Sequence, residues 1–295
     1  MSQPVIKAPP FVKYVVYFNG QNAAAVVPPN PAFYGSQLTV VAWFTIISNP
    51  GSWAGVVDTT VYGDKNWGIL TGQGGTCSVV AGARYSNGGA TIYYPSVNCG
   101  EVHQYVLRIN GNEVSAFLDG KLYQTQPGSG SYVTDTSLPL VIGGRPHGPL
   151  PSLPYDFSNV AVWQVLVYNR ALSDAEVAQL YSNPTSPITS GLVLWLQADP
   201  AYIQGSTWLD LSGNGNNATL YNVQLVQLVT PSSSPIVLPI TPSPTISPTL
   251  SVAPTPTSPT PPTSKPTPWL WVGVGIATVV AMGAGLYIAH KKGLI

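Results

Sequence analysis

The stretch VLVYNRALSDAEVAQLYSNP, residues 165–184, contains the strongest fold signal in the sequence. Its first residues, VLVY, are aliphatic and aromatic, as is typical of a buried strand. Ser173 stands three positions before Glu176, which is the spacing of a capping box, and the run that follows predicts a short helix. Pro184 comes after that helix and stops it. The stretch therefore predicts a strand that leads directly into one capped helix.

Upstream, residues 14–168 consist of short runs rich in β-branched and aromatic residues, separated by Gly, Pro and Asn. No helical pattern lies between these runs, which indicates an all-β antiparallel sandwich. The pairs Asn110-Gly111 and Asp119-Gly120 predict hairpin turns of type I′, because Asn, Asp and Gly tolerate the positive φ that this turn requires.

The composition excludes several classes of protein. Charged residues make up 7% of the chain, with 11 basic and 11 acidic residues, whereas about 25% is usual in a soluble domain. This balance leaves no basic surface for nucleic acid, so we expect the sandwich not to bind it. Two cysteines are too few for a disulfide scaffold or a zinc site. The neutral polar surface suits an exposed protein, and a hot, acidic habitat is one setting that favours it.

The C-terminal part of the chain differs from the rest. Residues 230–268 are almost wholly Pro, Ser and Thr, which predicts an extended stalk, either bare or carrying O-linked sugars. Residues 269–289 form an uncharged apolar run long enough for one transmembrane helix. The short tail 290–295 contains Lys291 and Lys292, which the positive-inside rule places on the inner side. We therefore expect a C-terminal anchor in a lipid bilayer, with the sandwich outside.

Small residues recur every fourth position along the predicted span and place a smooth stripe on one helix face. They are Gly273, Ala277, Ala281 and Gly285. The stripe predicts a homo-oligomer formed through the span, and the alternative is a small-residue helix that faces lipid. The N-terminus has no apolar region of the signal-peptide type. Two arrangements remain open, a virion that assembles around an internal membrane and a cell surface reached through an atypical signal.

Four stretches together resemble the laminin G-like branch of the concanavalin A-like lectin/glucanase family. They are YFNGQNAAAVVP (17–28), LTVVAWF (38–44), FLDGKL (117–122) and the most specific, VYNRALSDAEVAQLY (167–181). The resemblance covers roughly residues 14–182. It implies two facing antiparallel sheets in a jelly-roll-like sandwich.

The order of the motifs departs from this family. GLVLWL (191–196) and WLDLSGNGNNATL (208–220) resemble its opening strand and loop, yet they follow the closing motif. Residues 187–229 either complete the sandwich of residues 1–186 by circular permutation or begin a second, truncated sandwich. A lone apolar strand would leave a large exposed surface, so we favour permutation.

The glucanases of this superfamily carry acidic residues two positions apart on one strand, where alternation puts them on one face. The three glutamates, Glu101, Glu113 and Glu176, have no acidic residue at that spacing, and Asp58 and Asp64 lie six apart. We therefore expect no catalytic residues and no enzyme activity. The alternative is a degenerate glycoside hydrolase whose carboxylates meet only in the fold.

No metal-binding pattern connects the three histidines, His103, His147 and His290. The resemblance implies that calcium could bind at a rim, where Asp58, Asp64 and Asp199 could contribute oxygen atoms. The alternative role for these carboxylates is to cap loops. We expect no cofactor, with calcium as the one exception that the resemblance allows.

Residues 50–75 combine aromatic rings with polar groups, which is how sandwiches usually bind sugars. We expect the ligand surface there, and the alternative is that the rings fill the core. The candidate ligand-binding residues are Trp53, Asp58, Tyr62, Asp64, Asn66 and Trp67.

The two cysteines flank a predicted hairpin, CSVVAGARYSNGGATIYYPSVNC (77–99). If the turn centres on Gly88, Cys77 lies directly opposite Cys99, close enough for a cross-strand disulfide. The alternative is two free thiols.

Taken together, these features predict a non-enzymatic, membrane-anchored surface protein. Its sandwich would serve adhesion, glycan binding or structural decoration. The expected location is the surface of a virion or a cell, in a virus or microbe from a hot habitat.

Overall fold

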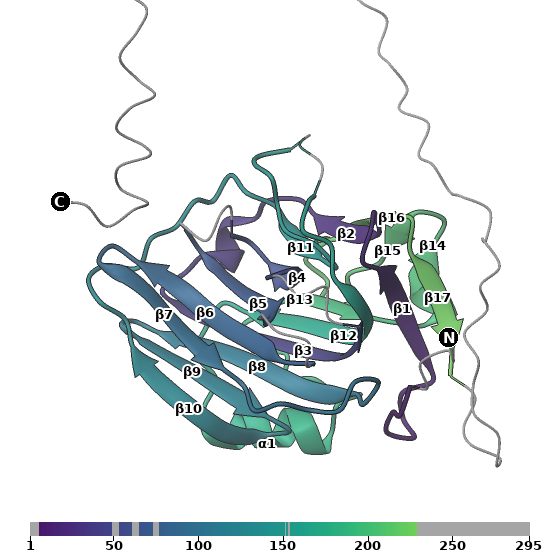
Figure 1. Ribbon diagram of the computed structural model, residues 1–295, viewed down its shortest axis with the longest axis horizontal. Helices are drawn as coiled ribbons and strands as arrows, with labels where there is room; N and C mark the ends of the chain where they lie inside the picture. The colour runs from purple at the N-terminus through teal and green to yellow at the C-terminus, as the bar shows by residue number, and fades with distance from the viewer. Residues whose placement is uncertain are drawn as a thin grey trace, which may run out of the picture. The chain divides into compact units, whose positions relative to one another are not determined.

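The computed structural model describes residues 6–48, 53–60, 65–72, 77–150, 152 and 154–228. Within these ranges the strands form two antiparallel sheets that face each other as a sandwich (Figure 1). Buried apolar side chains from both sheets form one core between them. The predicted all-β antiparallel sandwich is therefore confirmed.

One face of the sandwich is a sheet of eight described strands, which we call the large sheet because it contains the longest strands, β3 and β12. In this sheet β13 (Leu192–Gln197) pairs with β12 outside the main strand order. The order along the path is β10 (Lys121–Pro127), β9 (Glu113–Leu118), β8 (His103–Asn110), β3 (Gln37–Ser48), β12 (Asn159–Tyr168), β1 (Tyr14–Asn19) and β17 (Gln224–Gln227).

The opposing face is a sheet of nine described strands that ends at β7 on one side and at β14 on the other. Its order is β14 (Ile203–Gln204), β15 (Thr207–Trp208), β16 (Ala218–Tyr221), β2 (Ala24–Val27), β11 (Leu140–Ile142), β4 (Gly55–Asp58), β5 (Trp67–Thr71), β6 (Val79–Tyr85) and β7 (Gly88–Tyr93).

The predicted helix is present as α1 (Asp174–Ser182). Both halves of its capping box form, because Glu176 N donates to Ser173 Oγ at 3.3 Å and Ser173 N donates to Glu176 Oε2 at 2.8 Å. Hydrogen bonds from Arg170 and from Ser173 lower the pKa of Glu176 to about 2. Two short 3-10 helices, η1 (Pro31–Phe33) and η2 (Pro200–Tyr202), complete the described helices.

The central strand β3 is buried on both faces, which explains its unbroken apolar run. Its inner face looks into the core, and its outer face is covered by α1 and the N-terminal segment. Tyr181 of α1 stacks on Trp43 with ring centroids 5.4 Å apart, and Phe11 meets the same indole edge-on at 5.4 Å. The helix and the N-terminal segment therefore close the outside of the large sheet.

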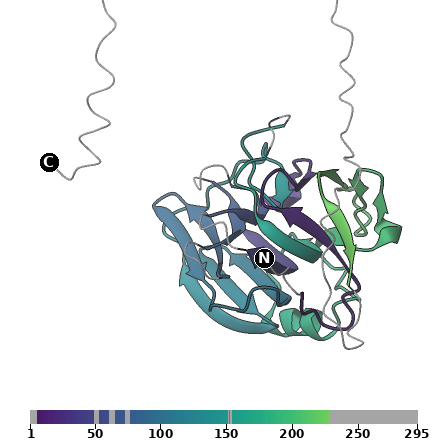
Figure 2. The same ribbon diagram turned by 45° about the vertical axis from the view of Figure 1, so that its right-hand side comes forward.

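The segment after the closing helix returns to the sandwich and contributes strands to both sheets. β13 pairs with β12, β16 pairs with β2, and β17 pairs with β1. Figure 2 brings these green strands forward, beside the purple first strand. Leu194, Leu196 and Trp208 are fully buried. The segment is thus built into the sandwich that begins at β1, and it supplies five strands where the sequence suggested a single one.

The two predicted hairpin turns differ in type. Asp119 and Gly120 both have positive φ, at 50° and 76°, which is the predicted type I′ turn. In the β8–β9 hairpin, Asn110 pairs with Glu113, so Gly111 and Asn112 are the central residues of the turn. Only Gly111 has positive φ there, which is a type II′ turn. The type I′ prediction at Asn110-Gly111 was wrong by one position, because strand pairing placed Asn110 inside the ladder.

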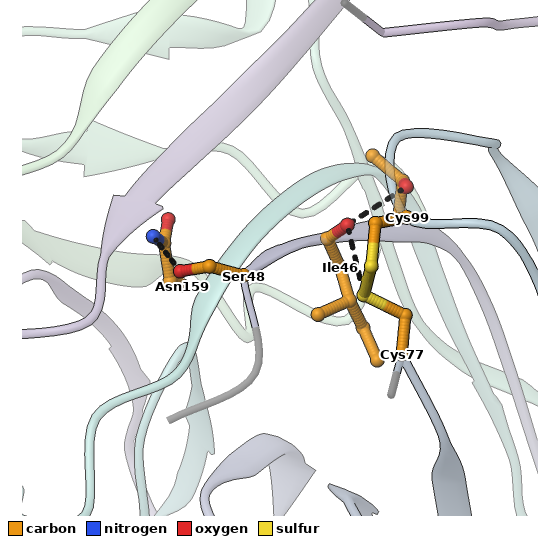
Figure 3. The surroundings of a disulfide bond; sticks show 6 residues. Ile46, Ser48, Cys77, Cys99 and Asn159 are labelled. Carbon is orange, nitrogen blue, oxygen red and sulfur yellow. Dashed lines mark hydrogen bonds between the residues drawn. A yellow bond between two sulfur atoms is a disulfide. The ribbon is translucent and has the colours of Figure 1, made fainter. Parts of the chain in front are cut away.

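A disulfide joins Cys77 to Cys99, with a Cα–Cα distance of 5.3 Å (Figure 3). The cysteines are not opposed in the hairpin ladder, which pairs Val80 with Tyr93 and Tyr85 with Gly88. Extending that register would set Cys77 opposite residue 96. The predicted apex at residues 87–89 was therefore wrong, and the bond forms because the chain leaves β7 after Tyr93 and returns toward the start of β6.

We expect the Cys77→Ala/Cys99→Ala variant to lose roughly 3 kcal/mol of unfolding free energy, because the bond closes a loop of 22 residues. Urea denaturation measures the loss. Adding a reductant to the wild type should lower its stability by a similar amount and leave the variant unchanged. A wild type that is indifferent to the reductant would contradict the prediction.

The predicted stalk, span, small-residue stripe and basic tail, residues 230–295, lie outside the described residues. In the ranges that the structure describes, no helix is long and apolar enough to cross a bilayer.

Candidate functional site

A shallow groove of about 350 Å³ opens on the outer face of the nine-stranded sheet, across β5, β6 and β7. Residues of β5, β6 and β7, of the segments beside β4 and β5 and of the loop after β11 line it. The residues that shape it include Trp53, Thr60, Gly68, Gly82, Thr91 and Arg145.

The floor of the groove follows from one row of cross-strand neighbours. The row runs from Asp58 of β4 to Gly68, Gly82 and Thr91 on the next three strands. The two adjacent glycines, Gly68 and Gly82, contribute no side chains to this floor. A Cβ at Gly68 would lie 2.6 Å from Asp58 Oδ1, so the carboxylate occupies the space over this glycine.

Two aromatic rings lie at the groove, because Trp53 lines it and Tyr93 contacts Trp53. Tyr93 follows Thr91 on the same face of β7, and its side chain is 57% exposed. Trp53 meets the Tyr93 ring edge-on, with centroids 5.9 Å apart. The pair presents an exposed apolar ring beside the hydroxyl group of Thr91, which is the combination that stacks on a sugar and hydrogen-bonds its hydroxyl groups.

A buried ion pair forms the side wall. Arg145 Nε donates to Asp58 Oδ2 at 3.0 Å, and its NH2 group donates to Thr60 Oγ1 at 2.8 Å. Thr60 N donates to Asp58 Oδ1 at 2.6 Å. Burial raises the pKa of Asp58 to about 6, although the Arg145 charge and these hydrogen bonds oppose the rise. These bonds hold the wall in one arrangement. Of the two charged residues, Arg145 lines the groove and Asp58 does not.

Asn66 connects the groove to the loop before β11. It has a positive φ of 63°, and its Nδ2 donates to the carbonyl oxygens of Thr59 and Asp135. Its Oδ1 accepts a hydrogen bond from Asp135 N at 2.7 Å. The side chain is fully buried. Asn66 therefore holds two loops together and offers the groove little free hydrogen-bonding capacity.

The predicted ligand residues separate into distinct groups. Trp53 and Asn66 line the groove, and Asp58 lies beneath its wall. Trp67 is fully buried in the core, where its Nε1 donates to Phe33 O at 2.7 Å. Its assignment to the ligand surface was wrong, because the alternation of β5 turns Trp67 inward and Gly68 outward. Tyr62 and Asp64 lie outside the described residues.

The sequence did not single out Tyr93, Thr91 or Arg145. Alternation within the run ATIYY puts Thr91 and Tyr93 on one face, and this signal could have identified them. Arg145 follows a Gly-Gly pair after β11 and has no such pattern, since only the fold brings it to Asp58.

Carboxylates are absent from the residues that line the described groove. Asp199, one of the calcium candidates, caps η2 by accepting a hydrogen bond from Ala201 N at 2.8 Å. Asp58 is engaged by Arg145 and Thr60. Across the described ranges, no three His, Cys, Asp or Glu side chains gather as a metal site would require.

A second ionisable cluster lies around His103 at the start of β8. His103 Nδ1 is 2.7 Å from Asp119 Oδ2, and its Nε2 is 3.9 Å from Glu101 Oε2. Lys7 Nζ in turn donates to Glu101 Oε1 at 3.1 Å. The hydrogen bond to Asp119 raises the pKa of His103, the nearby carboxylate charges add to the rise, and burial opposes it. The cluster connects the N-terminal segment to the β9–β10 turn.

We expect His103 to stabilise the sandwich in acid. Because the pKa of His103 is raised in the folded state, the folded state holds the proton more tightly than the unfolded chain does. The resulting contribution to the unfolding free energy is complete below about pH 6.5, the pKa of an unfolded His, and disappears as the pH rises through the folded pKa. Melting curves of wild type and His103→Gln should differ more at pH 5.5 than at pH 8.5. A difference that is constant, or larger at pH 8.5, would refute this role.

Comparisons with known proteins agree with the fold. The Laminin_G_3 family, described as the Concanavalin A-like lectin/glucanases superfamily, matches residues 19–178, more than half of the chain. A search of curated proteins finds no match.

Among solved structures, a "putative carbohydrate binding protein" from Bacteroides ovatus ATCC 8483 aligns with a TM-score of 0.56 at 14% identity. The alignment covers 76% of this chain and 62% of that one. A heptameric SAP-like pentraxin from Limulus polyphemus aligns with a TM-score of 0.46 at 13% identity, over 59% of this chain and 83% of the pentraxin. At these identities the first similarity shows a shared fold. The match over residues 19–178 shows that the chain belongs to the concanavalin A-like lectin/glucanase superfamily.

Proposed function

We propose that this chain is a non-enzymatic surface protein whose sandwich binds glycans in the groove across β5–β7. A C-terminal membrane anchor, residues 269–289, would hold it on a virion or a cell surface and associate it into a homo-oligomer. No cofactor is needed for this role. The single observation that carries the proposal is the contact of the exposed Tyr93 ring with Trp53, which lines a groove with two glycines in its floor.

The chemistry of the groove favours a sugar. Pyranose rings have an apolar face that stacks on aromatic side chains and a rim of hydroxyl groups that hydrogen-bond. Tyr93 provides the ring, while Thr91 and Thr60 provide hydroxyl groups. The "putative carbohydrate binding protein" from Bacteroides ovatus shares the fold and adds support at that level. Among the described residues the lining has no carboxylate, which supports binding over hydrolysis, because glycosidases use two carboxyl groups.

The position of the groove suits display. The described chain ends at Leu228, whose N–H donates to Lys13 O at 2.7 Å beside β1 and β17. β17 ends the large sheet on the side opposite β10, while β7 at the groove lies beside β10 (Figure 1). If a tether starts after Leu228, the groove lies at the opposite edge of the sandwich, where a ligand can reach it.

A glycan array with the full chain in detergent tests the proposal, followed by titration of each hit. We expect Trp53→Ala and Tyr93→Ala each to weaken binding about tenfold or more, which is a typical effect of losing a stacked aromatic ring. Tyr123→Ala is the matched control, because Tyr123 is 46% exposed on β10 and stacks on Tyr94, whereas Tyr93 contacts the groove residue Trp53. It should leave affinity unchanged.

Three results would refute glycan binding at this site. One is an array without hits, which would favour a purely structural role. Another is equal loss from Tyr93→Ala and Tyr123→Ala. The third is release of reducing sugar from a bound glycan, which would identify the chain as a glycoside hydrolase.

A further inference from the structure

Asn217, at the turn before β16, is exposed and stands in a sequence pattern that the other asparagines of this turn lack. Asn217 begins the triplet Asn217-Ala218-Thr219, which has the N-x-[ST] pattern of an N-glycosylation acceptor. Every other asparagine in the chain lacks Ser or Thr two positions later, except Asn183, where the intervening residue is a proline that blocks the pattern.

The loop that precedes Asn217 is held to the sandwich by its polar groups. The Asp210 carboxylate accepts hydrogen bonds from the backbone N–H groups of Trp195, Ser212 and Asn216, at 2.9 Å each. Asn216 also donates through Nδ2 to Val193 O at 2.7 Å. These contacts engage the side chains that face β13, so the loop has a defined shape.

Asn217 has a different arrangement. Its Oδ1 accepts a hydrogen bond from Asp210 N at 2.8 Å, while its Nδ2 has no hydrogen-bond partner among the described residues. The side chain is exposed. The bond to Oδ1 holds the amide through its oxygen atom, and Thr219 follows in β16, where it is partly exposed.

We infer that Asn217 is an N-linked glycosylation site. The donor would be a lipid-linked oligosaccharide phosphate, delivered by an oligosaccharyltransferase. The Asn217 Nδ2 forms a bond to the anomeric carbon of the sugar and loses one proton, while the bond from that carbon to the phosphate breaks and the lipid phosphate leaves. The product keeps Oδ1 as an acceptor, so the hydrogen bond from Asp210 N is retained.

The surroundings are compatible with a bulky glycan. β16 lies four strands from β5 in the nine-stranded sheet, a distance of roughly 20 Å at the usual spacing of strands. The glycan would cover the short strands β14 and β15 and leave the groove open. The Cys77–Cys99 disulfide agrees with an oxidising environment outside the cytosol.

Peptide mass spectrometry of the full chain, produced in its native host, tests the inference. We expect the peptide that contains Asn217 to carry a glycan mass. Thr219→Val is isosteric and makes the triplet unrecognisable, so the mass should be lost, whereas Thr219→Ser keeps the hydroxyl group and should keep it. Thr219 Oγ1 has no hydrogen-bond partner among the described residues, so both variants should melt like the wild type.

A bare Asn217 peptide in the wild type would overturn the inference, and so would a glycan mass that persists in Thr219→Val. Ligand binding in the groove should be the same for Thr219→Val and Thr219→Ser. The outcome for Asn217 is therefore independent of whether the groove binds glycans.

Discussion

Deleting residues 191–228 is expected to unfold the sandwich, although the deletion leaves the family's closing motif intact. The segment provides β13 against β12, β16 against β2 and β17 against β1, so its loss exposes edges in both sheets. It also removes side chains that are fully buried, and each large one contributes about 2–5 kcal/mol. The sum exceeds the 5–15 kcal/mol that typically separates folded from unfolded domains. Circular dichroism and a thermal melt measure the result.

A point variant keeps this prediction testable if the deletion aggregates. Trp208→Ala should lower the unfolding free energy by about 3–5 kcal/mol, because the indole is fully buried and its Nε1 donates to Gln197 O at 2.9 Å. Trp195→Ala is the matched control, since Trp195 is in the same segment and only partly buried. A deletion variant that melts cooperatively near the wild-type temperature, or equal losses from both Trp variants, would show that the segment is an appendage.

Replacing Arg145 by Met is expected to cost about 3–5 kcal/mol, because it leaves the buried Asp58 carboxylate without its counter-charge. The double variant Arg145→Met/Asp58→Asn should recover much of that loss, since no charge is then buried unpaired. Urea denaturation of the wild type, both single variants and the double variant completes the cycle. A double variant no more stable than Arg145→Met would contradict the prediction.

The cost should depend on pH in a definite direction. Burial raises the pKa of Asp58 from 3.8 to about 6, so the folded state keeps this proton at pH values where the unfolded chain has lost it. Stability linked to Asp58 therefore falls as the pH rises from about 4 to 6. Without Arg145 the folded pKa rises further, so the deficit of Arg145→Met should be larger at pH 7 than at pH 4.5. Equal deficits at the two values would mean that Asp58 is not the group responsible.

Features that depend on close neighbours in the chain could be predicted. The capping box of α1 and the type I′ turn at Asp119-Gly120 each involve a few adjacent residues, and both are present. Register could not be predicted in the same way. The turn at Asn110-Gly111 shifted by one position and the β6–β7 hairpin turned earlier than expected, because pairing along whole strands decides where a turn begins.

The sequence suggested candidate ligand residues without separating groove from core. Trp53 lines the groove, and its role in binding stays a prediction, whereas Trp67 belongs to the core. Both rings were reasonable ligand groups from composition, and the phase of the alternation in β5 turns Trp67 inward. That phase depends on which face of the sheet is covered, which is a property of the assembled sandwich.

The sequence by itself determined the class of fold, the one capped helix, and most of the strand segments in residues 14–168, because these follow from local propensity and the period of apolar residues. Tertiary structure alone decided that residues 192–227 enter both sheets, that Arg145 reaches Asp58 across 87 positions of sequence, and that Tyr93 meets Trp53. Contacts of this kind join segments far apart in the chain, and their positions result from the packing of the whole core.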